Sequence, residues 1–170
     1  MIQCYFGNGK GKTTASVGAA IRYLGCEKRV LYVSFLKDGT SSELNILTQL
    51  PNLEVKIPPV VYRLYDNQNP QKTEALSQAY TCFFCEELQR IAPSFDMIVL
   101  DEILDTVSFG YLEESRFLEL VKSWSNRSEI ILTGHKLSEN IARICDYISE
   151  VSSKKHPFEQ GKPSRRGIEY

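Results

Sequence analysis

A glycine-rich run near the start of the chain constrains the fold more than any other feature. The run Gly7-Asn8-Gly9-Lys10-Gly11-Lys12-Thr13-Thr14 follows an apolar, strand-like segment, Ile2–Phe6, and opens a segment with helical periodicity at 13–24. Glycines at such a junction let the backbone curl so that several N–H groups point into one small space. The following helix adds the partial positive charge of its N-terminus. The sequence therefore predicts a strand, an anion-binding loop and a helix in that order.

The residue types within this loop favour a polyphosphate with its metal ion. Lys12 supplies a compact cation, and the Thr13 hydroxyl can ligate Mg²⁺. Phe6 stands where the common phosphate-binding pattern has its first glycine, but Gly7 and Gly9 can provide the flexibility. The alternative, a glycine turn with incidental lysines, is disfavoured because the run lies at a strand-to-helix junction. The residues predicted to bind phosphate are Gly7, Asn8, Gly9, Lys10, Gly11, Lys12, Thr13 and Thr14.

Short apolar segments alternate with helical segments along the rest of the chain. This alternation predicts an α/β fold with a mostly parallel sheet between two helical layers, the three-layer sandwich of P-loop NTPase-like (RecA-like) proteins. With 170 residues, one domain over 1–170 is expected, and 153–170 forms a polar tail predicted to pack near the active site. Strands are predicted at 2–6, 30–36, 53–57, 97–100, 129–132 and 147–151, and helices at 13–24, 42–50, 72–92, 112–124 and 138–145.

Composition excludes several classes of function. The 20 Lys and Arg residues balance 21 Asp and Glu residues, and this near-neutral total argues against nucleic-acid or polybasic membrane binding. No apolar run approaches the ~18–20 residues that cross a bilayer, and no signal peptide is evident at the start. An odd count of five cysteines favours free thiols in a reducing, cytoplasmic compartment. Cys82 and Cys85 form a C-x-x-C pair, but without a second pair we interpret them as buried or half-buried helical thiols.

Two carboxylates follow a second apolar strand. Asp101 and Glu102 come directly after the predicted strand 97–100, at the end where ligands bind in open α/β sheets. Together with Thr13 they can hold Mg²⁺. Alone, they would be read as a solvated acidic pair, but the glycine loop makes a nucleotide site the better interpretation. His135 follows another strand and should lie at the same edge, either as a phosphate donor or as a helix-entry turn residue.

The motifs taken in order resemble one known family, the P-loop type of ATP:corrinoid adenosyltransferase. The resemblance runs from residue 7 to the last residue, and the tail motifs discriminate most because ordinary P-loop proteins lack them. The motifs that carry it, besides the loop, are Arg22, Phe35-Leu36-Lys37, Glu43, Val99-Leu100-Asp101-Glu102, Thr133-Gly134, Lys155-His156-Pro157-Phe158 and Arg166-Gly167-Ile168-Glu169-Tyr170.

The resemblance implies a transferase that moves the 5′-deoxyadenosyl group of ATP to the Co(I) of a reduced corrinoid such as cob(I)alamin and releases triphosphate. This reaction serves adenosylcobalamin synthesis or salvage. The resemblance also implies Mg²⁺, a homodimer and a flavin-type reductase as electron donor. By position, Lys12, Thr13 and Glu102 would be catalytic, and Thr13, Asp101 and Glu102 would hold the metal. Arg22, Lys37 and His135 would join the loop in binding ATP, with Glu43 near the nucleotide.

The chain departs from the family pattern in three places. His135 stands where the family usually has arginine, so a group with a pKa of ~6.5 replaces a permanent cation. The aromatic Gly-Phe-Thr-Trp lid of the family is replaced here by 60–65, in which Tyr62 and Tyr65 are either corrinoid-binding substitutes or ordinary loop residues. The chain also starts almost at its first strand, without the N-terminal extension of longer members.

Two other functions stay open at the level of sequence. A P-loop kinase or ATPase of another class would transfer the γ-phosphoryl group, although no arginine-rich lid is evident. No Asn-Lys-x-Asp motif is found, which disfavours a GTPase. A non-catalytic module would bind nucleotide and never adenosylate a corrinoid.

Overall fold

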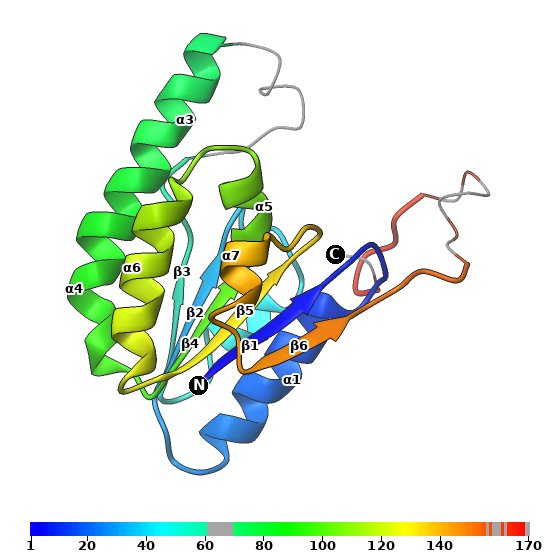
Figure 1. The fold of residues 1–170 in the computed structure, drawn as a ribbon. Coiled ribbons are helices and arrows are strands. Elements are labelled where there is room, and N and C mark those ends of the chain that lie inside the picture. The colour runs from blue at the N-terminus through cyan, green and yellow to red at the C-terminus, as the bar shows by residue number, and fades with distance from the viewer. Residues whose placement is uncertain (61–69, 156, 158–160, 162, 169–170) are drawn as a thin grey trace.

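A computed structural model of the chain describes residues 1–60, 70–155, 157, 161 and 163–168, without the side chains of 70–72. Figure 1 shows a twisted sheet with helices on both sides. The six strands of the described part are all parallel and lie in the order β3-β2-β4-β5-β1-β6. The predicted α/β fold is therefore confirmed. The strands are β1 (Ile2–Phe6), β2 (Val30–Ser34), β3 (Leu53–Lys56), β4 (Met97–Asp101), β5 (Glu129–Gly134) and β6 (Tyr147–Glu150).

Alternate residues of the central strands enter two separate cores. Leu31 and Val33 of β2 face the larger core, whereas Val30 and Tyr32 face the smaller one. Both faces of β2, β4 and most of β5 are buried, which explains why these strands read as nearly continuous apolar runs. Within the described residues, no helix is both long and apolar enough to cross a membrane.

The two helical layers differ in size. Helix α1 (Lys12–Leu24) packs on β4, β5, β1 and β2, and the short α2 (Leu44–Leu47) lies near β3 on the same side. The opposite face carries a longer series of elements (Figure 1). They are α3 (Pro70–Cys82), η2 (Phe83–Leu88), α4 (Gln89–Ile91), η3 (Ala92–Ser94), α5 (Ile103–Ser108), α6 (Glu114–Ser125) and α7 (Glu139–Ala142).

The long helix predicted at 72–92 is interrupted by a π-helical turn at Phe83–Leu88. A wider turn changes the angular spacing of side chains, and here the consecutive Phe83 and Phe84 are both buried. The Phe84 ring lies 5.2 Å from the Trp124 ring of α6, and Phe83 meets Phe35 edge-on at 6.0 Å. The C-x-x-C cysteines lie in and before this turn. Both are free thiols; Cys85 is half-buried as expected, but Cys82 is exposed, so the expected burial is wrong at that position.

Several element boundaries differ from the sequence-based expectation, and two of the differences bear on the site. Strand β2 ends at Ser34 rather than 36, and Leu36 adopts a left-handed backbone with φ 53°. Helix α5 was not predicted, because its six residues are too few to show helical periodicity. It begins after Glu102, whose φ of 63° turns the chain sharply out of β4. Both differences lie at the carboxyl edge of the sheet.

Candidate functional site

The glycine loop after β1 is fixed by backbone contacts at its start and middle. The N–H of Gly7 donates to the carbonyl oxygens of Gly134 and His135, both at 3.2 Å, and the N–H of Gly9 donates to Val151 at 2.7 Å. Gly7 has a φ of 114°, and a Cβ there would lie 2.6 Å from the Val151 oxygen. A Cβ on Gly9 would lie 2.7 Å from the same atom. These glycines are therefore required because the loop passes against the backbone that leaves β6.

Side chains of the loop contact both its own backbone and the C-terminal tail. The Lys12 ammonium is buried beneath the loop and donates to the Gly9 carbonyl at 3.0 Å. Asn8 accepts a hydrogen bond from the N–H of Ser153 at 3.0 Å, and the Lys10 ammonium donates to the carbonyl of Ile168. Two separate parts of the tail thus meet the loop from outside.

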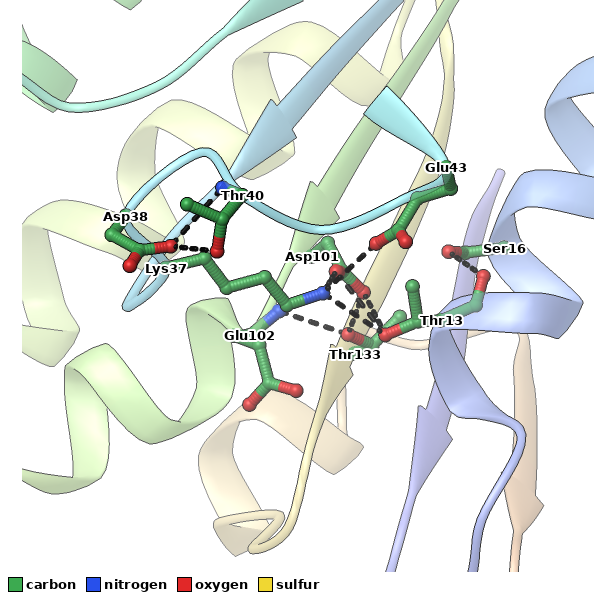
Figure 2. A network of polar contacts seen from close by, with 9 residues as sticks. All are labelled: Thr13, Ser16, Lys37, Asp38, Thr40, Glu43, Asp101, Glu102 and Thr133. Atoms are coloured by element: carbon green, nitrogen blue, oxygen red, sulfur yellow. Dashed lines mark hydrogen bonds and ion pairs between the residues drawn. The ribbon is translucent and has the colours of Figure 1, made fainter. Parts of the chain in front are cut away.

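Asp101 is the centre of a polar network at the end of β4 (Figure 2). Its carboxylate is fully buried and accepts hydrogen bonds from the Thr13 hydroxyl at 3.1 and 3.2 Å and from the Thr133 hydroxyl at 2.8 Å. Thr133 in turn accepts from the backbone N–H of Glu102 at 2.9 Å. Adjacent parallel strands bring these groups together, since β4 lies beside β5.

Lys37 neutralises this buried carboxylate. Its ammonium lies 2.7 Å from Asp101 and 3.4 Å from Glu43, and it also reaches the Thr13 hydroxyl at 3.5 Å. Burial by itself would lower the pKa of Lys37, but the charge and hydrogen bond of Asp101, with Glu43 and Glu102, raise it above its ordinary value. The lysine is therefore a fixed cation beside the loop.

Glu102 belongs to a second cluster, together with Asp105 and His135. Figure 2 shows its carboxyl group pointing away from the Thr13, Asp101 and Lys37 network. Burial, followed by the neighbouring charge of Asp101 and a hydrogen bond to Asp105, raises the pKa of Glu102 from 4.5 to about 8. Asp105 is buried, and its carboxylate accepts from the backbone N–H of His135 at 3.0 Å and contacts the His135 ring at Nδ1 at 2.9 Å.

A cavity of about 830 Å³ opens between these two clusters. Its size is in the range of sites that hold cofactor-sized ligands. The start of α1, the segment after β2, α5, His135 and the tail all contribute walls. The lining residues are Thr13, Thr14, Val17, Leu36, Lys37, Asp38, Thr40, Ser41, Ser42, Glu43, Glu102, Asp105, Phe109, His135, Gly167 and Ile168.

The fold brings most of the predicted site residues to this edge, but it separates Arg22 from them. Arg22 is exposed in the last turn of α1, ten residues beyond Lys12. At 1.5 Å per residue it lies about 15 Å further along the helix axis. Within this chain Arg22 therefore does not meet the loop. Tyr62 and Tyr65 lie outside the described residues, so their predicted contact with a corrinoid stays a prediction.

Sequence reasoning missed Asp105 and gave Thr133 no role of its own. Asp105 lies in the unpredicted helix α5, and Thr133 was noted only as part of a motif. The available signal was position, because Asp105 lies shortly after β4 and Thr133 lies at the end of β5, and the carboxyl ends of these two strands share one sheet edge.

This geometry defines a P-loop nucleotide-binding protein. The parallel sheet has a glycine loop after its first strand, and a buried lysine lies beneath that loop. A threonine of the loop is bonded to a buried aspartate at the end of a strand. The particular family follows from comparison with known proteins. The ATP:corrinoid adenosyltransferase BtuR/CobO/CobP family matches residues 1–170, and the chain belongs to this family. It is an adenosyltransferase, and ATP and a corrinoid are the substrates of its family.

Relatives in several bacteria support this membership. The corrinoid adenosyltransferase of Escherichia coli K12 is 31% identical over 178 residues, a match covering 100% of this chain and 85% of the relative. The corrinoid adenosyltransferase CobA of Salmonella typhimurium is 32% identical over 173 residues with the same coverage. The Pseudomonas aeruginosa enzyme is 27% identical and is covered to 83%. The chain thus matches these enzymes along its whole length.

Proposed function

We propose that the cavity beside the glycine loop binds ATP and presents its 5′-carbon to the reduced corrinoid. In the step that follows, the electron pair of Co(I) forms the Co–C bond and the bond from C5′ to oxygen breaks. The triphosphate leaves with that bonding pair, and cobalt is formally oxidised to Co(III). The observation that carries this proposal is the cavity itself, which has the loop threonines on one wall and Lys37 and Glu43 on another.

The leaving group explains why an adenosyltransferase uses a phosphate-binding loop. The triphosphate gains negative charge as the C–O bond breaks, so fixed cations and N–H donors lower the barrier by stabilising the transition state. We assign this role to the loop amides, Lys12 and Lys37. Lys12 releases its bond to the Gly9 carbonyl when a phosphate oxygen takes that place. Positioning of the 5′-carbon supplies the rest, because the cobalt carries the difficult chemistry.

The donor set at the end of β4 fits the Mg²⁺ that accompanies ATP. The Thr13 hydroxyl and the Asp101 carboxylate are already 3.1 Å apart, and oxygen donors of these kinds are the ligands that Mg²⁺ prefers. Once bound, Mg²⁺ would neutralise phosphate charge. We include Thr13, Asp101 and Glu102 as its candidate ligands, with Lys37 bonded to Asp101 at 2.7 Å.

The rest of the proposal concerns the wider molecule. We propose that the whole chain is one domain, that its tail closes the nucleotide cavity, and that the enzyme is a cytoplasmic homodimer served by a flavin-type reductase. Contacts of the tail with Asn8 and Lys10 support the second point. Exposed Tyr147 and Ile148 on the edge strand β6 support a contact with another subunit.

Anaerobic incubation with ATP, Mg²⁺ and chemically reduced cobalamin tests the reaction. We expect a light-sensitive Co–C product and one equivalent of triphosphate. Because no phosphorus–oxygen bond is broken, an ATP analogue with a β,γ-methylene bridge should also yield the product. Lys12→Ala should abolish both reactions. Formation of ADP and phosphate from ATP, with no product from the analogue, would instead show a kinase or ATPase.

A further inference from the structure

Two cysteine side chains that are far apart in the chain meet beside β1. Cys4 lies in the middle of this strand and is only 1% exposed, as part of the larger core. Cys145 lies in the segment between α7 and β6, is half-buried and packs against the same core. A hydrogen bond joins the two side chains. The fold thus forms a pair of thiols that does not appear as a C-x-x-C motif in the sequence.

The segment that carries Cys145 is bonded to the start of β1. The backbone N–H of Asp146 donates to the Ile2 carbonyl at 2.8 Å, and the Ile2 N–H donates to the Asp146 carboxylate at 2.7 Å. Strand β6 then runs parallel to β1, with Ile148 opposite Cys4. Adjacent strands are about 4.8 Å apart, and a disulfide joins Cα atoms about 4.4–6.8 Å apart. A bond between the two sulfur atoms would therefore link elements that are already neighbours.

The hydrogen bond gives the two thiols different chemical characters. It raises the pKa of the Cys4 thiol, and burial raises that pKa further. The same bond lowers the pKa of the Cys145 thiol, although burial and the nearby charge of Asp146 act in the opposite direction. The thiolate is the form of cysteine that attacks a disulfide. Cys145 is therefore the attacking thiol by both acidity and access, and Cys4 lies behind it in the core.

The C-x-x-C cysteines provide a contrast at the surface. Cys82 is exposed, and its thiol donates to the Glu86 carboxylate at 3.3 Å. That bond, followed by the negative charge of Glu86, raises the pKa of the Cys82 thiol. Cys82 is thus more accessible than Cys145 but has less thiolate at a given pH. Exposure alone therefore does not identify the cysteine most suited to exchange.

We propose that Cys145 and Cys4 form a site of reversible oxidation that reacts with low-molecular-weight disulfides such as oxidised glutathione. The Cys145 thiolate attacks one sulfur of the small disulfide, and the other half leaves as a thiolate that takes up the proton lost by Cys145. Cys4 then gives up its proton and displaces the second half, which leaves as a second small thiol. Two cysteine thiols become one disulfide, and the protein transfers two electrons to the small disulfide. A dithiol reductant reverses the reaction.

The product would fasten the edge of the sheet. Strand β6 is the outermost strand beside β1, and all four of its residues are exposed. It leads to Val151, whose carbonyl accepts from Gly9 of the glycine loop. A disulfide from Cys4 to Cys145 ties the start of β6 to β1 and closes a long loop in the unfolded chain. Such a link stabilises the folded state mainly by restricting the unfolded one.

Exposure of the reduced protein to oxidised glutathione, followed by alkylation of the remaining thiols and peptide mass spectrometry, tests the site. We expect the parent chain to give a disulfide that links the peptides of Cys4 and Cys145, and dithiothreitol should restore both thiols. Cys4→Ser should instead keep glutathione on Cys145, because the serine cannot displace it. Cys145→Ser, in which the hydroxyl can still donate to the Ile141 carbonyl, should leave the buried Cys4 reduced. The oxidised parent should unfold about 5 °C or more above the reduced parent.

Cys26→Ser provides the matched control, because Cys26 is exposed in the turn after α1. It should form the same link between Cys4 and Cys145 as the parent chain, and thermal unfolding under reducing conditions checks that each variant is folded. Glutathione retained on Cys145 of the parent, a Cys145 thiol that stays reduced, or a link from Cys145 to a different cysteine would overturn the proposal. Neither ATP nor corrinoid enters the measurement, so its failure and a failure of the adenosyl-transfer reaction are separate results.

Discussion

Single residues at the loop decide how closely two backbone segments can approach. Gly7 and Gly9 lie against the Val151 carbonyl, whereas Gly11, whose φ of 116° is close to the 114° of Gly7, has open space where a Cβ would lie, with nothing within 4 Å. The two positions therefore separate the cost of backbone strain from the cost of a steric clash.

We predict that Gly7→Ala lowers the free energy of unfolding by about 2–4 kcal/mol and that Gly11→Ala lowers it by about 1–2 kcal/mol. The first substitution meets both strain and the backbone oxygen of Val151, and the second meets strain alone. Urea unfolding followed by circular dichroism measures both values. Equal losses in the two variants would show that the contact with Val151 has no energetic consequence.

Glu102 gives the metal-free, nucleotide-free protein a predictable response to pH. Its pKa is about 8 in the folded chain, raised from 4.5. Between these values the unfolded chain releases its proton while the folded chain retains it, so stability falls as pH rises from about 5 to 8. Glu102→Gln has no proton to release.

The free energy of unfolding of Glu102→Gln relative to the parent should therefore rise from pH 5 to pH 8 by about 1 kcal/mol or more. This value is smaller than the full pKa difference would give, because Glu102 keeps partial contact with water. Urea titrations of both proteins at several pH values, in the presence of a chelator, supply the comparison. Parallel profiles for the two chains would contradict the raised pKa.

At the scale of elements, α1 carries the loop and crosses the middle of the sheet. It buries Ser16 and Ala20 against β4 and β5 but exposes Gly18, where a built Cβ would have nothing within 4 Å. Glycine in a helix interior costs about 0.5–1 kcal/mol relative to alanine.

Gly18→Ala should accordingly raise the free energy of unfolding by about 0.5–1 kcal/mol. Because the new methyl group points into open space, affinity for ATP should not change. Thermal unfolding and nucleotide titration check the two parts, and a destabilised variant would mean that α1 has a neighbour at this position.

At the scale of the whole molecule, the last residues of the chain return to the first loop. Gly167 and Ile168 line the cavity, although the described residues of 163–168 are exposed and lie outside both hydrophobic cores. The tail can therefore affect ligand binding while contributing little to stability.

Deletion of residues 163–170 should weaken ATP binding by about threefold to tenfold, equivalent to about 0.7–1.4 kcal/mol. The free energy of unfolding should change by less than about 1 kcal/mol, because both cores stay intact. Isothermal titration and urea unfolding measure these effects. Lys154→Ala, altered in an exposed tail residue, serves as the control and should bind ATP like the parent. Unchanged affinity after the deletion would exclude the tail from the cavity.

Local patterns in the sequence were sufficient to predict the sheet, the glycine loop and the carboxylates at the end of β4. Alternating apolar segments specify buried parallel strands, and a glycine-rich strand-to-helix junction specifies a phosphate loop. Both can be predicted from consecutive residues alone, without knowledge of which other residues lie nearby in the folded chain. Arg22 shows the limit of matching motifs in order within one chain: the helix predicted at 13–24 already places it about 15 Å from Lys12 along the axis, and the motif order takes no account of that distance.

Only the tertiary structure decided which groups act on one another. It paired Lys37 with Asp101, turned Glu102 toward Asp105 and His135, and brought the tail to Lys10. These contacts join residues far apart in the chain, and their existence depends on strand order, on the left-handed turn at Glu102 and on the short helix α5. The sequence by itself determined a P-loop α/β protein with a nucleotide site. The distribution of charge within that site was decided by folding, because electrostatic interactions depend on distance in space and on burial.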